Sequence, residues 1–325
     1  MNNIINKPLV IGKFHPSSLV KYGDMIHYHI DIGEHDLATW QKTIKKLKPR
    51  TIIFGSNIVN REMLNIWREE MPQDQLFLIR RGASLARCDV VAAKKLNINV
   101  KNTPGSNAAY IAKFICDSIL KQGKYPKIVT ILGVGNIGSI VAQRLVNDVS
   151  ELNLYSRSLQ NNITQKQVLA DLWLDQYLNV SSISSIQQGF CKSNCIIITL
   201  PYTSETKGLI AQSDIQSIPK NANFISTSFP NILEDEAIKE LHSRDDINVI
   251  FDHLRNEFDH VYSIIGTKIL RPNFIIDEKA AATDECQIAM DEAVMQSFQQ
   301  LNLKNQAGED IYPHSRLEEV AKGNM

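Results

Sequence analysis

Six residues near the middle of the chain, Gly133-Val134-Gly135-Asn136-Ile137-Gly138, have the types and the spacing of a turn that binds phosphate groups. They directly follow the apolar run 128–132 and lead into the helical pattern 139–145. This context, between a strand and a helix, separates a dinucleotide-binding turn from a glycine turn without a ligand. The sequence therefore predicts that a dinucleotide binds here.

The glycine at each of three positions in this turn has a physical reason. Gly133 permits the tight turn, Gly135 lets the backbone approach a pyrophosphate, and Gly138 allows close packing of the helix on the strand. The N–H groups at the start of the helix, including those of Asn136 and Ile137, have no acceptor within the helix and are available to the phosphates.

The residues after the next predicted strand, 151–155, bear on the choice of dinucleotide. A site selective for NAD places an acidic residue there to hold the ribose hydroxyls, but this chain has Ser156, Arg157 and Ser158. Arg157 can pair with a 2′-phosphate through charge-assisted hydrogen bonds. The alternative is an exposed loop arginine without a ligand. We predict NADP(H) as the preferred cofactor and keep NAD(H) as the second choice.

The composition excludes several other classes of function. The 325 residues carry 35 basic and 35 acidic side chains, a balance that favours neither nucleic acid nor a membrane surface as partner. No export signal and no spanning apolar run is visible, so we expect a cytoplasmic protein that binds a small molecule. Cys191 and Cys195 are too far apart for a redox pair or a zinc knuckle, which predicts free thiols and no metal site.

Short apolar runs alternate with amphipathic stretches along the chain, a pattern typical of βαβ units. The Pro104-Gly105 pair interrupts this pattern and predicts a domain boundary, with a helical tail from Thr283 to about Leu301 that packs back on the first domain. We expect domains of 1–104 plus 283–325, and of 105–282. The predicted strands are 9–11, 25–28, 51–54 and 76–79, then 128–132, 151–155, 195–199, 224–227 and 249–251; helices are predicted at 36–47 and 60–70.

Three further motifs, taken with the glycine turn, identify a resemblance that runs from about Thr51 to Met290. They are 80–84 (RRGAS), 102–108 (NTPGSNA) and 200–210 (LPYTSETKGLI). In this order they resemble the D-2-hydroxyacid dehydrogenase family, and Tyr155-Ser156-Arg157-Ser158 looks like its NADP-using, glyoxylate/hydroxypyruvate reductase-like branch. The resemblance implies an α/β fold of two doubly wound parallel-sheet domains, a flavodoxin-like substrate domain and a Rossmann dinucleotide-binding domain.

The family also implies positions for the binding residues. Its active site lies between the domains, with the nicotinamide contacted by an aspartate that matches Asp252. The loop at Arg80, with the backbone of Gly82, Ala83 and Ser84, matches the family loop that holds an anionic substrate group; an interdomain salt bridge is the alternative for Arg80. Further cofactor contacts fall on Leu200, Pro201, Thr206 and Thr227.

The family's catalytic residues are only partly present. Its arginine, which grips the substrate carboxylate, falls on Phe229, and its glutamate falls on Glu257. Its histidine falls on Lys279, or on Glu278 because this segment looks one residue short. A positioned proton donor contributes about 10²–10⁴ in rate, so turnover of ordinary 2-hydroxy acids should be very slow. We expect a substrate with a different headgroup.

Lys279 is the residue that we predict to transfer the proton. As an acid it needs a pKa lowered from about 10.4 toward about 7–8, which burial achieves, while Glu257 orders it or balances its charge. A surface lysine is the alternative. His253 and His260 match nothing catalytic in the family, and we expect structural or solvated roles for them.

The predicted function is an NADP(H)-dependent oxidoreductase that acts on a CH–OH or related group. It transfers hydride to or from the carbonyl or imine carbon of a small polar metabolite. The rival is a non-catalytic dinucleotide-binding regulatory protein with the same fold, favoured by the two missing catalytic residues. A homodimer through the apolar helix 108–120 is expected from the family, and burial of this helix within one chain is the competing explanation.

Overall fold

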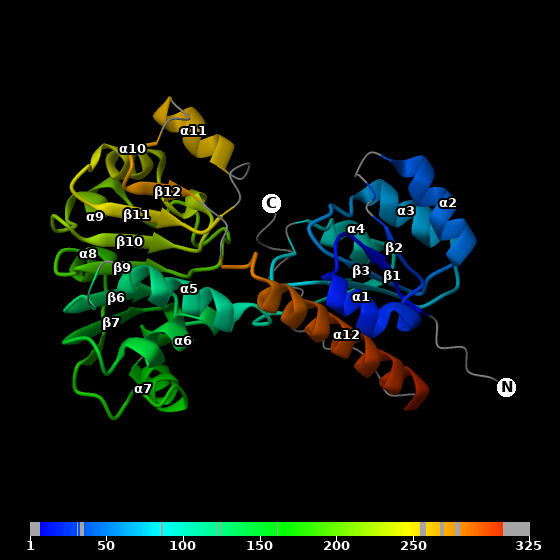
Figure 1. The fold of residues 1–325 in the computed structure, drawn as a ribbon, viewed down its shortest axis with the longest axis horizontal. Coiled ribbons are helices and arrows are strands. Elements are labelled where there is room, and N and C mark those ends of the chain that lie inside the picture. The colour runs from blue at the N-terminus through cyan, green and yellow to red at the C-terminus, as the bar shows by residue number, and fades with distance from the viewer. Residues whose placement is uncertain are drawn as a thin grey trace. The chain divides into compact units, whose positions relative to one another are not determined.

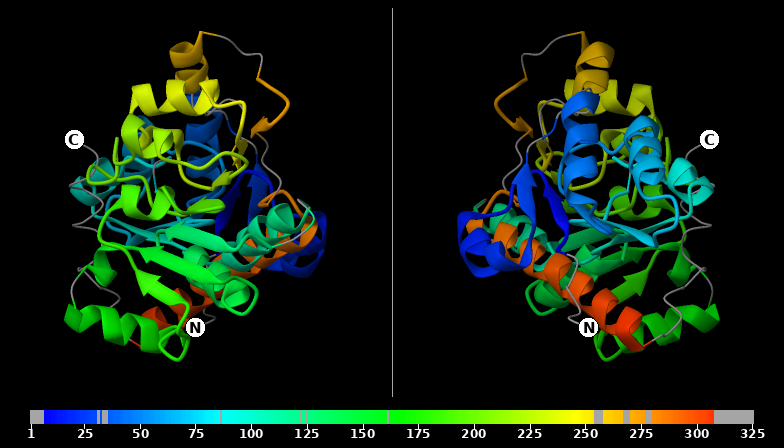
Figure 2. Two further views of the ribbon diagram at one scale, coloured as in Figure 1. Left: turned by 90° about the vertical axis from the view of Figure 1, so that its left-hand side faces the viewer. Right: turned by 90° about the vertical axis from the view of Figure 1, so that its right-hand side faces the viewer.

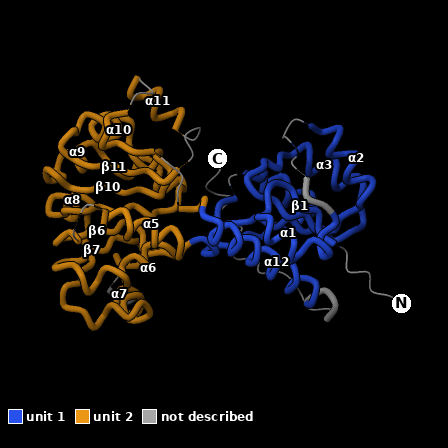
Figure 3. The backbone as a smooth tube through the Cα atoms, viewed as in Figure 1, with its two compact units in different colours: residues 1–107, 283–323, 325 blue, residues 108–282, 324 orange. Residues whose placement is uncertain are grey.

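The computed structural model describes residues 7–30, 32, 36–85, 87–121, 123, 125–160, 162–253, 258–266, 270–276 and 280–307. These residues form two compact units, coloured separately in Figure 3. The first unit runs to Asn107 and resumes at Thr283, and the second runs from Ala108 to Ala282.

Within the described residues, the first unit contains a five-stranded parallel sheet with the order β2-β1-β3-β4-β5. This is the flavodoxin-like order that we expected for one of the domains. Strands β1, β2 and β3 are labelled in Figure 1. The strands are β1 (Leu9–Ile11), β2 (Tyr28–Ile30), β3 (Thr51–Phe54), β4 (Leu76–Arg80) and β5 (Ile98–Asn102). The helices are α1 (Pro16–Tyr22), η1 (Gly23–Met25), α2 (Leu37–Leu47), α3 (Arg61–Glu70), α4 (Val90–Lys95) and α12 (Asp284–Ala307).

Strands β1, β3 and β4 are buried on both faces, because their alternate residues enter different apolar clusters. Ile52 and Phe54 pack with the tryptophans of α2 and α3, whereas Ile53 packs on the opposite face with residues of α12, including Phe298. The tail helix therefore packs on the first unit, as expected, and lies beside α1 in Figure 2 (orange to red against blue).

The second unit contains, within the described residues, a seven-stranded parallel sheet with the order β12-β11-β10-β9-β6-β7-β8. Read from β8, this is the Rossmann order 3-2-1-4-5-6 with one added strand. The strands are β6 (Ile128–Leu132), β7 (Glu151–Tyr155), β8 (Val180–Ser182), β9 (Cys195–Ile198), β10 (Asn223–Ser226), β11 (Asn248–Phe251) and β12 (Phe274–Ile276). The helices are α5 (Ala108–Leu120), α6 (Asn136–Leu145), η2 (Arg157–Leu159), α7 (Asn162–Asp171), α8 (Ile186–Phe190), α9 (Gln212–Gln216), η3 (Pro230–Ile232), α10 (Asp235–Ser243) and α11 (Asp259–Ile265). The predicted fold class is confirmed.

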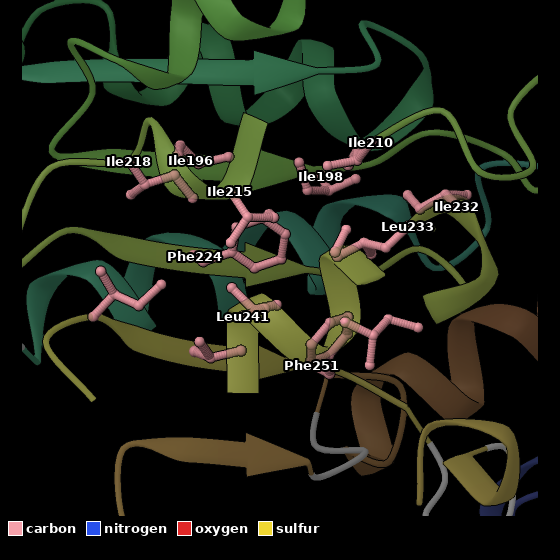
Figure 4. Packing of buried hydrophobic residues seen from close by; sticks show 14 of the residues in the cluster. Ile196, Ile198, Ile210, Ile215, Ile218, Phe224, Ile232, Leu233, Leu241 and Phe251 are labelled. Atoms are coloured by element: carbon pink, nitrogen blue, oxygen red, sulfur yellow. The ribbon is translucent and has the colours of Figure 1, made fainter. Parts of the chain in front are cut away.

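Strands β9 and β10 of the second unit alternate in the same way. Ile196, Ile198 and Phe224 point into one cluster, where the labelled side chains of Figure 4 pack against α9 and α10. Ile197 and Ile225 enter the other cluster with residues of α5 and α6. The apolar face of α5 is therefore buried within its own unit, and the homodimer stays a prediction.

Four strand predictions need correction. The second strand lies at Tyr28–Ile30 rather than at 25–28, because Gly23–Met25 forms a 3₁₀ turn first. Three strands, β5, β8 and β12, were not predicted. Polar residues interrupt β5 and β8, so neither shows the continuous apolar run of a central strand, and β12 is only 3 residues long.

Candidate functional site

The glycine turn connects β6 to α6 at the carboxyl end of β6, an interior strand of the second unit. Gly133 has φ +98°, a left-handed conformation that favours glycine, and its N–H donates to the Tyr155 carbonyl at 2.8 Å. A Cβ on Gly133 would lie 2.8 Å from the Thr199 carbonyl carbon and 2.9 Å from the Leu200 nitrogen. The backbone of the loop after β9 therefore excludes any side chain here.

The other two glycines differ in what surrounds them. A Cβ on Gly138 would lie 1.9 Å from the Gly133 carbonyl oxygen, so Gly138 allows the helix to pack on the turn. A Cβ on Gly135 would meet no atom within 4 Å. Since α6 begins at Asn136, its first N–H groups, including that of Ile137, lack acceptors within the helix. Open space beside a helix N-terminus is the arrangement that a pyrophosphate requires, and these residues fit a dinucleotide.

Thr199 is a positioning residue that the sequence did not reveal. It follows β9, and its hydroxyl lies 2.6 Å from the Gly133 carbonyl oxygen, to which it donates. Its N–H donates to the Leu132 carbonyl at 2.8 Å. Thr199 thus holds the turn from the adjacent strand, a contact that no local sequence pattern indicates.

The loop after β7 carries the residues predicted to select the cofactor. The hydroxyls of Ser156 and Ser158 are hydrogen-bonded to each other at 2.7 Å. Arg157 is exposed, and its Nη1 pairs with the Glu205 carboxylate. Glu205, which lies in the loop after β9, is a second residue that sequence reasoning missed.

The loop after β9 is tied together by Thr206. Its hydroxyl donates to the Pro201 carbonyl at 2.6 Å and accepts from the Thr203 N–H at 2.8 Å. The Leu200 carbonyl accepts from the Ser228 hydroxyl at 2.7 Å, which joins this loop to the one after β10. Thr206 therefore shapes the loop in which we predicted cofactor contacts.

Thr227 and Asp252 lie where β10 and β11 end. The Thr227 N–H donates to the Ile198 carbonyl at 3.0 Å, and the Asp252 N–H donates to the Ser226 carbonyl at 2.9 Å. The buried Asp252 carboxylate accepts from the Ala280 N–H at 3.1 Å. Both residues thus lie at the carboxyl edge of the sheet, where ligands of such folds bind.

Phe229 lies in an aromatic cluster at the same edge. Its ring centroid is 6.0 Å from that of Tyr202 and 5.1 Å from that of His253, which in turn is 6.0 Å from Phe258. An unpaired carboxylate would be poorly solvated against these rings. His260 lies in α11, with its Nε2 3.3 Å from the Asp235 carboxylate.

Arg80, Gly82, Ala83 and Ser84 form the end of β4 and the following loop in the first unit. Burial lowers the pKa of Arg80 to about 10, helped by the positive charges of Arg87 and Arg81. Its guanidinium carbon lies 5.5 Å from the centre of the Phe54 ring, and no carboxylate of the described residues pairs with it. A partly buried cation of this kind can bind an anion.

The loop backbone is less available than we expected. Gly82 has φ +109°, and its N–H donates to the Thr103 hydroxyl at 2.8 Å. Ala83 and Ser84 are exposed, while the Ala83 carbonyl accepts from the Asn102 side chain at 2.6 Å. Any backbone contact to an anion therefore falls to Ala83 and Ser84.

The predicted proton-transfer residues Lys279 and Glu257, and the alternative Glu278, lie outside the described residues. Among the residues that the structure describes, no three acidic, histidine or cysteine side chains are grouped to hold a metal ion. No helix in the described part of the chain is both long and apolar enough to cross a membrane. All five cysteines are free.

Comparison with known proteins identifies the second unit. Residues 117–277 match the family model described as D-isomer specific 2-hydroxyacid dehydrogenase, NAD binding domain. The chain is 27% identical over 173 residues to erythronate-4-phosphate dehydrogenase from Blochmanniella floridana, and 24% identical over 187 residues to hydroxypyruvate reductase from Thermotoga maritima. Each match covers 50% of this chain, with 43% and 56% of the two relatives, so the chain spans about half the length of the curated relatives it matches.

A solved structure extends the likeness of fold to nearly the whole chain. The NAD⁺-bound 3-phosphoglycerate dehydrogenase of Entamoeba histolytica superposes with a TM-score of 0.67 at 19% identity, covering 91% of this chain and 96% of that one. At 19% identity, the structural similarity shows the fold of each unit and no more than the fold.

Proposed function

The chain belongs to the D-2-hydroxyacid dehydrogenase family, and from this premise we propose that it is an NADP(H)-dependent oxidoreductase with an altered catalytic set. It acts on a CH–OH or related group of a small polar metabolite. The observation that carries this proposal is the turn at Gly133, Gly135 and Gly138, which excludes side chains at two positions and leaves open space at the third.

The dinucleotide, when bound, supplies or accepts the hydride. In our proposal, the N–H groups of Asn136 and Ile137 hold its pyrophosphate, and Ser156, Arg157 and Ser158 receive the 2′-phosphate of NADP(H). We further propose that Asp252 contacts the nicotinamide and that Leu200, Pro201, Thr206 and Thr227 make additional cofactor contacts. The names of the relatives and the matched family model support a nicotinamide dinucleotide.

Each unit offers one feature for substrate binding, a cation in the first unit and an apolar wall in the second. We propose that Arg80, with the backbone of Ala83 and Ser84, holds an anionic substrate group, and that Gly82 contributes by shaping the loop. Phe229 with Tyr202 and His253 would face the part of the substrate where the family usually binds a carboxylate. This favours a carbonyl compound whose group at that end is uncharged.

Proton transfer remains assigned to Lys279, assisted by Glu257, with Glu278 as the alternative position. A lysine whose charged form is disfavoured by burial can hold or release a proton near neutral pH. We also propose that the chain forms a homodimer and is located in the cytoplasm.

The experiment that tests the function measures both binding and turnover. Purified chain is titrated with NADPH and NADH by nucleotide fluorescence, and oxidation of NADPH is followed with 2-oxo acids, aldehydes, ketones and imines. Tight NADPH binding with turnover of at least one non-carboxylate carbonyl compound is expected.

Two results would go against this proposal. Binding without turnover of any compound would favour the rival, a non-catalytic regulatory protein, for which the aromatic surroundings of Phe229 are the supporting observation. Absence of affinity for either dinucleotide would remove the oxidoreductase assignment.

A further inference from the structure

Arg157 and Glu205 connect the loops that follow two different strands of the second unit. Arg157 comes directly after β7, and Glu205 lies in the loop after β9. Both strands are direct neighbours of β6 in the sheet, one on each side. The ion pair therefore joins the loops that flank the phosphate-binding turn.

Glu205 extends from a loop with a defined conformation. The Thr203 N–H donates to the Thr206 hydroxyl at 2.8 Å, that hydroxyl donates to Pro201, and the Lys207 N–H donates to the Thr203 carbonyl at 3.0 Å. Thr206 is 8% exposed, whereas the Glu205 side chain is 61% exposed. The loop thus presents the carboxylate to Arg157 and to the solvent.

This contact changes how the cofactor-selecting loop is understood. The sequence after β7 lacks the acidic residue that holds the ribose hydroxyls in NAD-selective sites. In space, however, a carboxylate does lie beside Arg157, and it comes from a residue 48 positions away. The guanidinium predicted to bind a 2′-phosphate already has an anionic partner.

We propose that Glu205 determines the balance between NADP(H) and NAD(H) by competing with the 2′-phosphate for Arg157. This inference rests on the proposed function. NAD(H) has no 2′-phosphate and leaves the ion pair intact. NADP(H) must displace the carboxylate and then keeps a phosphate group, with about 1.5–2 negative charges at neutral pH, close to Glu205. Like charges at this separation repel each other, so Glu205 weakens NADP(H) binding selectively.

The experiment replaces the carboxylate by an amide of the same shape. In Glu205→Gln, we expect the Kd for NADPH to fall about 3- to 10-fold, because an exposed ion pair and a like-charge contact are each of modest strength. The Kd for NADH should stay within about 2-fold of wild type. Fluorescence titration of the purified full chain measures both constants without catalytic turnover.

Three further variants test whether the effect comes from competition for Arg157. In an Arg157→Gln background, Glu205→Gln should give a smaller gain, because no guanidinium remains to be released; the four proteins form a double-mutant cycle. Glu236→Gln is the matched control. Glu236 is 60% exposed, pairs with Lys239 at 2.7 Å in the same unit, and loses the same charge. Both Kd values should be unchanged in this control.

The outcomes separate this inference from the proposed function. If wild type binds neither dinucleotide, the proposed function fails and this inference falls with it. If wild type binds and Glu205→Gln leaves the ratio of the two Kd values unchanged, this inference alone is overturned. A gain of equal size in Glu236→Gln would also overturn it, because net charge would then explain the effect.

Discussion

The Arg81 guanidinium lies with its Nε 2.5 Å from Oδ1 of Asp291, in an ion pair whose side chains are 8% and 0% exposed. Oδ2 of Asp291 accepts from the His15 N–H at 2.8 Å, and Arg81 donates to the Gln287 side chain at 2.7 Å. These contacts connect the loop after β4, the start of α1 and the distant helix α12. They make α12 a structural part of the first unit.

Breaking this pair should destabilise the protein strongly. Removing one partner leaves an uncompensated buried charge, so Arg81→Met or Asp291→Asn should lower the free energy of unfolding by about 3–5 kcal/mol. The double variant Arg81→Met/Asp291→Asn should lose less than the sum of the two single variants. Urea denaturation followed by circular dichroism measures these differences. As a control, Lys21→Met removes an exposed pair with Glu292 between α1 and α12 and should have little effect. A strictly additive double variant would contradict the ion-pair explanation.

His242 should make stability depend on pH. Burial lowers the pKa of His242 from its ordinary value of 6.5, and the positive charge of Arg271 lowers it further. The folded-state pKa is therefore below that of the unfolded chain. As the pH falls through and below 6.5, the unfolded chain binds a proton that the folded chain does not, and stability decreases.

The variant His242→Phe tests this linkage, because it keeps a ring against Phe274, whose centroid is 5.8 Å from that of His242. The loss of unfolding free energy between about pH 7.5 and pH 5.5 should be smaller in the variant than in wild type. Urea titrations at both pH values measure it. An unchanged difference would show that other groups cause the pH dependence.

The predicted fold was accurate in the centre of each sheet and poor at the edges. Central strands such as β3 and β9 are buried on both faces, so they appear in the sequence as continuous apolar runs. The four edge strands, β2, β5, β8 and β12, were displaced or missed. An edge strand has a neighbour on one side only and tolerates polar residues such as Ser181, which removes the signal.

The residues of the candidate site also differ in how well the sequence predicted them. The roles of Gly133 and Gly138 were predictable because local geometry sets them, and strand and helix flank them in sequence. Thr199 and Glu205 act across the sheet on residues more than 40 positions away, on Gly133 and Arg157 respectively. Such contacts depend on strand order, which a local pattern does not contain.

Arg80 should contribute to substrate binding more than to the chemical step. Arg80→Met removes a cation that no described carboxylate pairs with, so the fold should tolerate it. A lost charge-assisted hydrogen bond of about 1.5–3 kcal/mol corresponds to a KM raised about 10- to 150-fold, with kcat changed little. Steady-state kinetics on the best substrate measure this. A fall in kcat at constant KM would contradict the assignment.

Lys279 should transfer the proton during turnover. Lys279→Met should reduce kcat by about 10²–10⁴-fold and should remove one limb of the pH profile of kcat, while the Kd for NADPH stays unchanged. Lys279→Arg, which keeps the charge but cannot lose the proton, should be nearly as slow. The pH dependence of kcat distinguishes proton transfer from loss of structure. A variant with the wild-type kcat would remove Lys279 from the mechanism and leave Glu278 as the alternative.

The three glycines of the turn should respond differently to substitution. Gly133→Ala and Gly138→Ala place a Cβ 2.8 Å and 1.9 Å from backbone atoms, so both variants should lose stability as well as dinucleotide binding. Gly135→Val adds a side chain where no atom lies within 4 Å, so its unfolding free energy should stay close to wild type. The same side chain would occupy the space that the pyrophosphate needs, which predicts a Kd for NADPH raised more than about 10-fold. Fluorescence titration together with urea denaturation separates the two effects. Normal NADPH binding by a stable Gly135→Val variant would show that the phosphates do not approach this turn. Loss of NADPH binding by a Gly135→Val variant of wild-type stability is the result that we expect if the phosphates bind here.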